Sequence, residues 1–148
     1  MERKQLPDDF KEFIQCLNSN NVKYLLVGGW AVGLYGHPRA TKDIDFLIFI
    51  DDDNLRSIEK ALANFGAPPI DIEYLREKGN VVRFGNSPIK IDIINEADGI
   101  EIEECYSRKK IINIDNIKIP VISKADLIIN KKSSGRQSDL ADVEKLEG

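Results

Sequence analysis

The chain has 148 residues, of which 42% are hydrophobic and 31% are charged, and its formal net charge is −4. This length fits a single domain over residues 1–148 with a substantial hydrophobic core. The negative net charge argues against a protein whose whole surface binds nucleic acid. No apolar run reaches the ~20 residues of a membrane helix, and the N-terminus lacks the apolar segment of a secretion signal. We therefore expect a cytoplasmic protein that does not associate with membranes.

The few cysteines and histidines exclude several kinds of site. Cys16 and Cys105 match no metal-binding spacing, so we expect both to stay reduced. The only histidine, His37, argues against a zinc site built from histidines and against most hydrolytic triads that need a histidine.

The first half of the chain alternates predicted helices and strands. Asp8 or Asp9 can cap the first helix, which continues to Leu17. Hydrophobic spacing then predicts a strand over 23–27, a short helix over 30–35, a strand over 43–50, and a helix that is capped within 51–54 and reaches 65. The strand over 43–50 is apolar on both faces apart from two aspartates, so we expect it at the centre of a sheet.

The second half places several strands before two helices. Strands are predicted over 81–84 and 89–94, joined by a turn, and a hairpin over 111–114 and 117–121. Ser123 caps a helix to about Lys132, residues 133–135 turn, and a short helix follows over 139–146. This order favours an α+β fold, with a mixed β-sheet flanked by helices and two short helices at the C-terminal end.

Three aspartates interrupt strands that are otherwise apolar. Asp43 and Asp45 are two residues apart, so they project from the same face of their strand, and Asp92 stands in the run Ile-Lys-Ile-Asp-Ile-Ile. Buried carboxylates are costly unless a cation neutralises them, and carboxylate oxygens are the ligands that Mg²⁺ or Mn²⁺ prefers. The alternative is that Asp43 and Asp45 merely end a strand and that Asp92 protects a sheet edge.

A glycine pair precedes these aspartates. Gly28 and Gly29 stand between a predicted strand and a predicted helix, where backbone without side chains can approach phosphate groups. Such a pair can also be only a tight turn. Together with the three carboxylates, it indicates a site for a divalent metal ion and a nucleoside triphosphate (NTP). Gly28, Gly29 and Gly33 do not form Gly-x-Gly-x-x-Gly, which argues against a dinucleotide-binding domain.

These motifs carry a resemblance to a known family. Val-Gly-Gly-Trp-Ala-Val at 27–32, followed by Arg-Ala-Thr-Lys-Asp-Ile-Asp-Phe-Leu-Ile at 39–48, resembles the signature of the DNA polymerase beta-type nucleotidyltransferase superfamily. Within it, the chain resembles bacterial abortive-infection-type and antibiotic-modifying nucleotidyltransferases, whose closing Lys…Gly-Arg-x-x-Asp-Leu-x-Asp segment has its counterpart at 131–142.

The resemblance assigns roles to the glycines and acids. Gly28 and Gly29 would hold the triphosphate, and Asp43 and Asp45 would ligate both metal ions. Asp92 would complete the metal site on the acceptor side and serve as the base that deprotonates the attacking hydroxyl.

The same resemblance points to four cations near the nucleotide. Arg39 and Lys42 flank the acids and either meet phosphate oxygens or are exposed turn residues. Lys131 and Arg136 match basic positions of the closing segment. They either reach the triphosphate or pair with the aspartates that follow them, Asp139 and Asp142.

The implied activity is metal-dependent transfer of a nucleoside monophosphate from an NTP to a hydroxyl acceptor, with release of pyrophosphate. The acceptor stays open between a small molecule, a protein side chain and an RNA end, and a toxin-antitoxin or abortive-infection system is one expected setting. Many relatives have a further helical domain, so we expect a partner protein or a homodimer to complete the acceptor site. The alternative is a catalytically inactive protein that keeps the fold as a binding or antitoxin partner.

Overall fold

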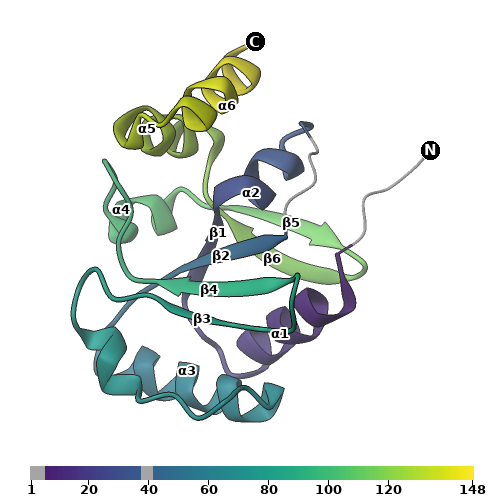
Figure 1. The fold of residues 1–148 in the computed structure, drawn as a ribbon, viewed down its shortest axis with the longest axis vertical. Helices are drawn as coiled ribbons and strands as arrows, with labels where there is room; N and C mark the ends of the chain where they lie inside the picture. The colour runs from purple at the N-terminus through teal and green to yellow at the C-terminus, as the bar shows by residue number, and fades with distance from the viewer. Residues whose placement is uncertain (1–5, 38–41) are drawn as a thin grey trace.

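The computed structural model describes residues 6–37 and 42–148, which form a six-stranded mixed sheet with helices on both sides (Figure 1). The elements in chain order are α1 (Asp8–Ser19), β1 (Tyr24–Val27), α2 (Gly28–Leu34), β2 (Asp43–Ile48), α3 (Asp52–Phe65), the 3-10 helix η1 (Ile72–Arg76), β3 (Val82–Phe84), β4 (Lys90–Ile94), α4 (Ile102–Ser107), β5 (Lys110–Ile114), β6 (Ile117–Val121), α5 (Lys124–Ser134) and α6 (Gln137–Glu147). The predicted α+β class and the two closing helices are confirmed.

The strand order is β3-β4-β2-β1-β6-β5. β2 pairs antiparallel with β1 and parallel with β4, and β1 pairs parallel with β6. β2 is therefore an internal strand, as its apolar faces predicted. β4 is internal as well, since it lies between β3 and β2, and so Asp92 does not protect a sheet edge.

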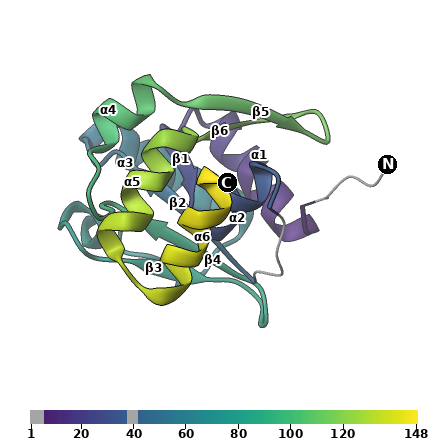
Figure 2. The ribbon, with the colours of Figure 1, turned by 90° about the horizontal axis from the view of Figure 1, so that it is seen from above.

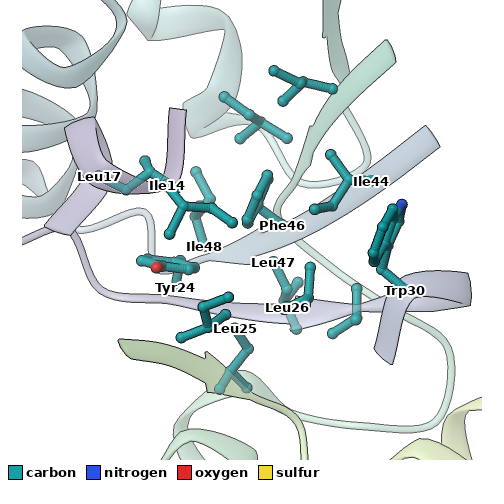
Figure 3. Packing of buried hydrophobic residues seen from close by; sticks show 14 of the residues in the cluster. Ile14, Leu17, Tyr24, Leu25, Leu26, Trp30, Ile44, Phe46, Leu47 and Ile48 are labelled. Carbon is teal, nitrogen blue, oxygen red and sulfur yellow. The ribbon is translucent and has the colours of Figure 1, made fainter. Parts of the chain in front are cut away.

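One face of the sheet packs against α1 and α3. Figure 3 shows part of the core, with Ile14 and Leu17 of α1 and Phe46 of β2 among the labelled residues. The ring of Phe13 on α1 lies 5.5 Å from that of Phe46 on β2, 5.2 Å from that of Phe65 on α3 and 5.4 Å from that of Phe84 on β3. Each ring meets its neighbour edge to face, which adds to the stabilisation from burial. Period-2 alternation then sends the other side chains of β2 to the opposite face.

The opposite face of the sheet lies under the C-terminal helices. α5 and α6 lie on the side of the sheet away from α1 and α3, and both lie over the strands when the molecule is seen from above (Figure 2). The side chains of β2 that alternate with Ile44, Phe46 and Ile48 are Asp43, Asp45 and Leu47. The predicted site residues of β2 therefore project toward the C-terminal helices.

Buried Asn54 ties the helix after β2 to the sheet. Its Nδ2 donates to the carbonyl oxygens of Lys23 at 3.0 Å and Phe49 at 2.7 Å, and its Oδ1 accepts from the Lys23 N–H at 2.7 Å. Asp51 caps α3 by accepting from the Asn54 N–H, in the stretch where the sequence predicted a cap. A fully satisfied buried amide of this kind fixes one arrangement of the chain.

Several element ends differ from expectation. Pro7, rather than Asp8 or Asp9, occupies the N-cap position of α1. Both aspartates lie in the first turn, where their negative charge interacts favourably with the positive end of the helix dipole. α2 starts at Gly28, and β2 ends at Ile48. These differences are local, because end residues have few tertiary contacts to fix them.

The C-terminal region keeps its predicted order with longer helices. Ser123 caps α5 as predicted, since its Oγ accepts from the Asp126 N–H at 3.1 Å. α5 continues to Ser134 and ends at Gly135, whose φ of 68° suits glycine. The short elements η1 and α4 were not predicted, because five or six residues carry too little periodicity. Within the described ranges, no helix is both long and apolar enough to cross a membrane.

Candidate active site

Strand pairing places two of the predicted acids, Asp45 and Asp92, next to each other in the sheet. In the register, Val27 of β1 faces Asp45 of β2, Asp45 faces Asp92 of β4, and Asp92 faces Arg83 of β3. Asp43 lies two residues before Asp45 on the same face of β2. The structure therefore brings together the three carboxylates that the sequence singled out. We call Asp43, Asp45, Asp92 and Arg83 the strand cluster.

Arg83 is the member of this cluster that the sequence analysis missed. Its Nε donates to Asp92 Oδ1 at 2.7 Å and its Nη2 to Asp92 Oδ2 at 2.9 Å, while Nη2 also lies 3.4 Å from Asp43 Oδ2. The pattern Val82-Arg83-Phe84, with two core residues around one arginine, already indicated that Arg83 faces away from the core. Its partner could be found only from the register of β3 on β4.

The strand cluster has an excess of negative charge. One guanidinium stands against three carboxylates, which leaves a formal charge of −2 when all are ionised. Burial, together with the adjacent Asp92 and Asp43, raises the pKa of Asp45 to about 7, although the positive charge of Lys131 opposes this shift. Burial and, after it, the neighbouring carboxylates thus bring the pKa of Asp45 close to neutral pH.

The cluster fits a divalent metal ion in its chemistry but does not present a finished cage. Its donors are carboxylate oxygens, which suit Mg²⁺ or Mn²⁺, and its formal charge of −2 matches such an ion. Across residues 6–37 and 42–148, however, no three acidic, histidine or cysteine side chains are placed to hold one metal ion. Both oxygens of Asp92 are instead bound by Arg83.

A pocket of about 390 Å³ opens beside the strand cluster. Its lining includes six residues that the sequence predicted: Gly28, Gly29, Asp43, Asp45, Lys131 and Arg136. Lys42 is exposed just before β2, and its carbonyl oxygen accepts from the Lys90 N–H at 2.8 Å. Arg39 lies outside the described residues. The pocket therefore joins the glycine pair, two of the acids and two of the cations.

The backbone at Gly28 leaves no room for a side chain. Its φ is +74°, and a Cβ atom at this position would overlap Asp45 Oδ2. A side chain is therefore excluded by both the backbone conformation and the carboxylate. The glycine pair lets the start of α2 approach Asp45 closely at the floor of the pocket.

Three further lining residues, Lys131, Arg136 and Asp139, form a second charged group together with Asp142, and we call these four residues the helix cluster. Buried Lys131 Nζ lies 3.0 Å from Asp139 Oδ1 and 3.0 Å from Asp142 Oδ2. The exposed Arg136 donates from Nε to Asp139 Oδ2 at 2.8 Å. The sequence left open whether Lys131 and Arg136 reach a triphosphate or pair with aspartates, and in this structure they form ion pairs with aspartates.

Hydrogen bonds set the charge of the helix cluster. Burial by itself would raise the pKa of Asp139, but hydrogen bonds from Ser134, Arg136 and Lys131 lower this pKa well below its ordinary range. Two cations and two carboxylates balance each other here. The helix cluster therefore needs no further ion, in contrast to the strand cluster.

The comparisons with known proteins agree with this geometry. The family described as nucleotidyltransferase of unknown function (DUF6036) matches residues 4–147. The chain belongs to this nucleotidyltransferase family. The predicted resemblance of the chain to nucleotidyltransferases is thereby confirmed. No curated protein sequence matches the chain.

Solved structures share the fold of this nucleotidyltransferase. The lincosamide antibiotic adenylyltransferase LnuA, in a lincomycin-bound structure, has a TM-score of 0.66 at 18% identity, with 99% of each chain covered. An antigenic nucleotidyltransferase-like protein from Paracoccidioides brasiliensis has a TM-score of 0.59 at 16% identity, with 93% of this chain and 74% of that one covered. At these identities the likeness establishes the fold and leaves substrates open.

The sequence analysis of this nucleotidyltransferase also missed one wall of the pocket. The loop between β4 and α4 contributes Glu96, Ala97 and Asp98 to the lining. Asn130 of α5 fixes this loop by donating from Nδ2 to the carbonyl oxygen of Asp98 at 2.9 Å. Nothing in the loop sequence identifies it as a pocket wall, because its position depends on α5 lying against it.

Proposed function

We propose that this nucleotidyltransferase moves a nucleoside monophosphate from an NTP to a hydroxyl acceptor and releases pyrophosphate, with Mg²⁺ or Mn²⁺ as its metal. The observation that carries the proposal is the strand cluster, in which Asp43, Asp45 and Asp92 share one face of the sheet beside a pocket. Carboxylates that converge in this way supply the oxygen ligands that Mg²⁺ and Mn²⁺ prefer.

The reaction consists of one displacement at phosphorus. The acceptor oxygen forms a bond to the α-phosphorus, and the bond from that phosphorus to the bridging oxygen of the β-phosphate breaks. Pyrophosphate leaves with the bonding electrons, and the hydroxyl proton passes to Asp92. A bound divalent ion would neutralise charge on the triphosphate and on the attacking and leaving oxygens.

Residues of the pocket would position the two substrates. Asp43 and Asp45 would hold the metal ion, and Asp92 would complete its site on the acceptor side. Gly28 and Gly29 would let the triphosphate approach the backbone at the pocket floor. These roles rest on the superfamily resemblance and on the shared pocket.

The cations would act from the opposite side. Arg136 is exposed at the pocket and can turn toward phosphate oxygens. Lys131 would add positive charge while it stays bound to Asp139 and Asp142. Arg39 and Lys42 are proposed to meet the triphosphate from the segment before β2.

The acceptor class is still open. A small-molecule hydroxyl is supported by the lincosamide adenylyltransferase, whose whole chain aligns with this one. A protein side chain or an RNA end fits the same chemistry, and a toxin-antitoxin or abortive-infection setting would supply either. A partner protein or a second copy of the chain is proposed to complete the acceptor site.

A catalytically inactive binding or antitoxin partner is the alternative function. The observation that favours it is the bidentate hold of Arg83 on Asp92, which occupies both oxygens of the proposed base. The two functions differ in whether a metal-bound nucleotide enters the pocket.

Calorimetric titration of each NTP, with and without Mg²⁺, tests the proposal. Wild type is expected to bind at least one NTP only when Mg²⁺ is present, and Asp45→Asn is expected to lose this binding while it keeps the fold. Asp53→Asn, which changes an exposed aspartate of α3, is the matched control and should bind like wild type. Folded wild type that binds no NTP would favour the inactive alternative, and equal binding by Asp45→Asn would refute the site.

A further inference from the structure

The third carboxylate of the proposed site is not accessible as it stands. The side chain of Asp92 is 8% exposed, and the two Arg83 nitrogens bind both of its oxygens. Asp92 is absent from the pocket lining, whereas Asp43 and Asp45 belong to it. Any ligand that uses Asp92 must therefore first take the place of the guanidinium.

Arg83 is free to make this exchange. Its side chain is 55% exposed, and within the described part of the chain its hydrogen bonds go to the carboxylates of Asp92 and Asp43. β3 is the outer strand of the sheet, so the arginine can turn toward solvent without disturbing the core residues on either side of it, Val82 and Phe84. The guanidinium can thus leave Asp92 without a rearrangement of the backbone.

We propose that Arg83 is a positioning residue that competes with the divalent metal ion for Asp92. This inference rests on the proposed function and adds a residue to it. In the metal-free protein, the guanidinium neutralises Asp92 and holds it beside Asp45. When the metal ion and nucleotide enter, the guanidinium turns outward and Asp92 is released toward the acceptor side of the site.

A second ion pair in the same molecule provides a matched control. Arg108 binds Asp126 in the same bidentate way, from Nε to Oδ2 at 3.1 Å and from Nη2 to Oδ1 at 2.9 Å. The exposures are alike too, 54% for the arginine and 4% for the aspartate. This pair belongs to neither the strand cluster nor the pocket beside it, so its loss has the same structural cost without a link to the metal site.

The test is a titration of the protein with Mn²⁺ in the absence of nucleotide. The electron paramagnetic resonance signal of free Mn²⁺ measures how much of the ion is bound. Arg83→Gln is expected to bind Mn²⁺ about three- to tenfold more tightly than wild type, because a competing cation has been removed. Arg108→Gln should bind like wild type. In Asp92→Asn the further change Arg83→Gln should give no gain, since the contested carboxylate is gone.

Arg83→Lys covers the case in which Arg83→Gln does not fold. It keeps a positive charge but loses the bidentate geometry, and so it should tighten Mn²⁺ binding by a smaller factor. Unchanged or weaker Mn²⁺ binding in the folded Arg83 variants would overturn the inference. If wild type still bound Mg²⁺ with an NTP, the proposed function would survive that result. Absence of any Mn²⁺ binding in wild type and all variants would overturn the inference, and it would overturn the proposed function as well only if wild type also failed to bind Mg²⁺ with an NTP.

Discussion

The strand cluster and the helix cluster border one pocket and use the same chemistry, but they differ in balance and in the burial of their cations. In the helix cluster, Lys131 is buried between Asp139 and Asp142. In the strand cluster, the cation is the half-exposed Arg83, and the carboxylates outnumber it. A buried, balanced pair is part of the framework, whereas an exposed cation in an unbalanced group can be exchanged for a ligand.

The largest expected effect comes from breaking the helix cluster. Lys131→Met would leave Asp139 and Asp142 buried without their common cation, at a cost of about 3–5 kcal/mol in the free energy of unfolding. Lys132→Met is the control on the same helix, because the pair of Lys132 with Glu147 is exposed on both sides. It should cost less than about 1 kcal/mol. Urea unfolding of both variants measures the difference, and equal costs would mean that the helix cluster is not part of the framework.

The pH dependence of stability should have opposite signs in the two clusters. The pKa of Asp45 is raised in the folded protein to about 7, from an ordinary value of 3.8, so the folded state binds more protons between these values. The contribution of Asp45 to stability is therefore largest below pH 4 and falls as the pH rises toward 7. The lowered pKa of Asp139 has the opposite effect, because its contribution is present at neutral pH and is lost in acid.

Asp45→Asn isolates the first of these effects. Relative to wild type, the variant should gain roughly 2–4 kcal/mol of stability between pH 4 and pH 8. Unfolding at several pH values, without divalent ions, checks this expectation, with Asp53→Asn as the control. Parallel curves for Asp45→Asn and wild type would show that Asp45 does not hold its proton in the folded state.

The smallest expected effect concerns the backbone behind Asp45. Gly28 and Gly36 both have positive φ, but only at Gly28 would a Cβ atom meet a neighbour, the carboxylate of Asp45. Each change to alanine should cost about 1 kcal/mol for the conformation, and Gly28→Ala at least about 1 kcal/mol more for the overlap. Thermal unfolding of the two variants compares them. An equal loss would show that Asp45 can move away from the backbone.

Strand β2 shows which part of the site could be predicted from the sequence. The alternation Asp43-Ile44-Asp45-Phe46 fixes which side chains share a face, and this prediction needs no knowledge of the rest of the molecule. The position of the glycine pair at the junction of a strand and a helix was also predicted from the local sequence pattern. The start of α2 at Gly28 was not predicted, because the ends of helices are less well defined by local sequence than their interiors.

The charge partners could not be predicted in this way. Arg83 is nine residues from Asp92 in the chain, and the two meet only because β3 pairs antiparallel with β4 in one register. A shift of that register by one residue would turn Arg83 to the core face. The pocket wall between β4 and α4 depends in the same way on α5 lying against it.

The sequence by itself determined the α+β class, the shared face of Asp43 and Asp45, and the resemblance to the family, since strand periodicity and short motifs are local properties of the chain. The register of β4 on β2 then placed Asp92 beside Asp45. Only the tertiary structure decided which cation each carboxylate meets, and so which cluster is balanced and which is not. The physical reason is that ion pairs form across strands and helices whose order and register are set by packing of the whole core. The charge deficit next to Gly28 is thus a property of the fold, although every residue in it can be read in the sequence.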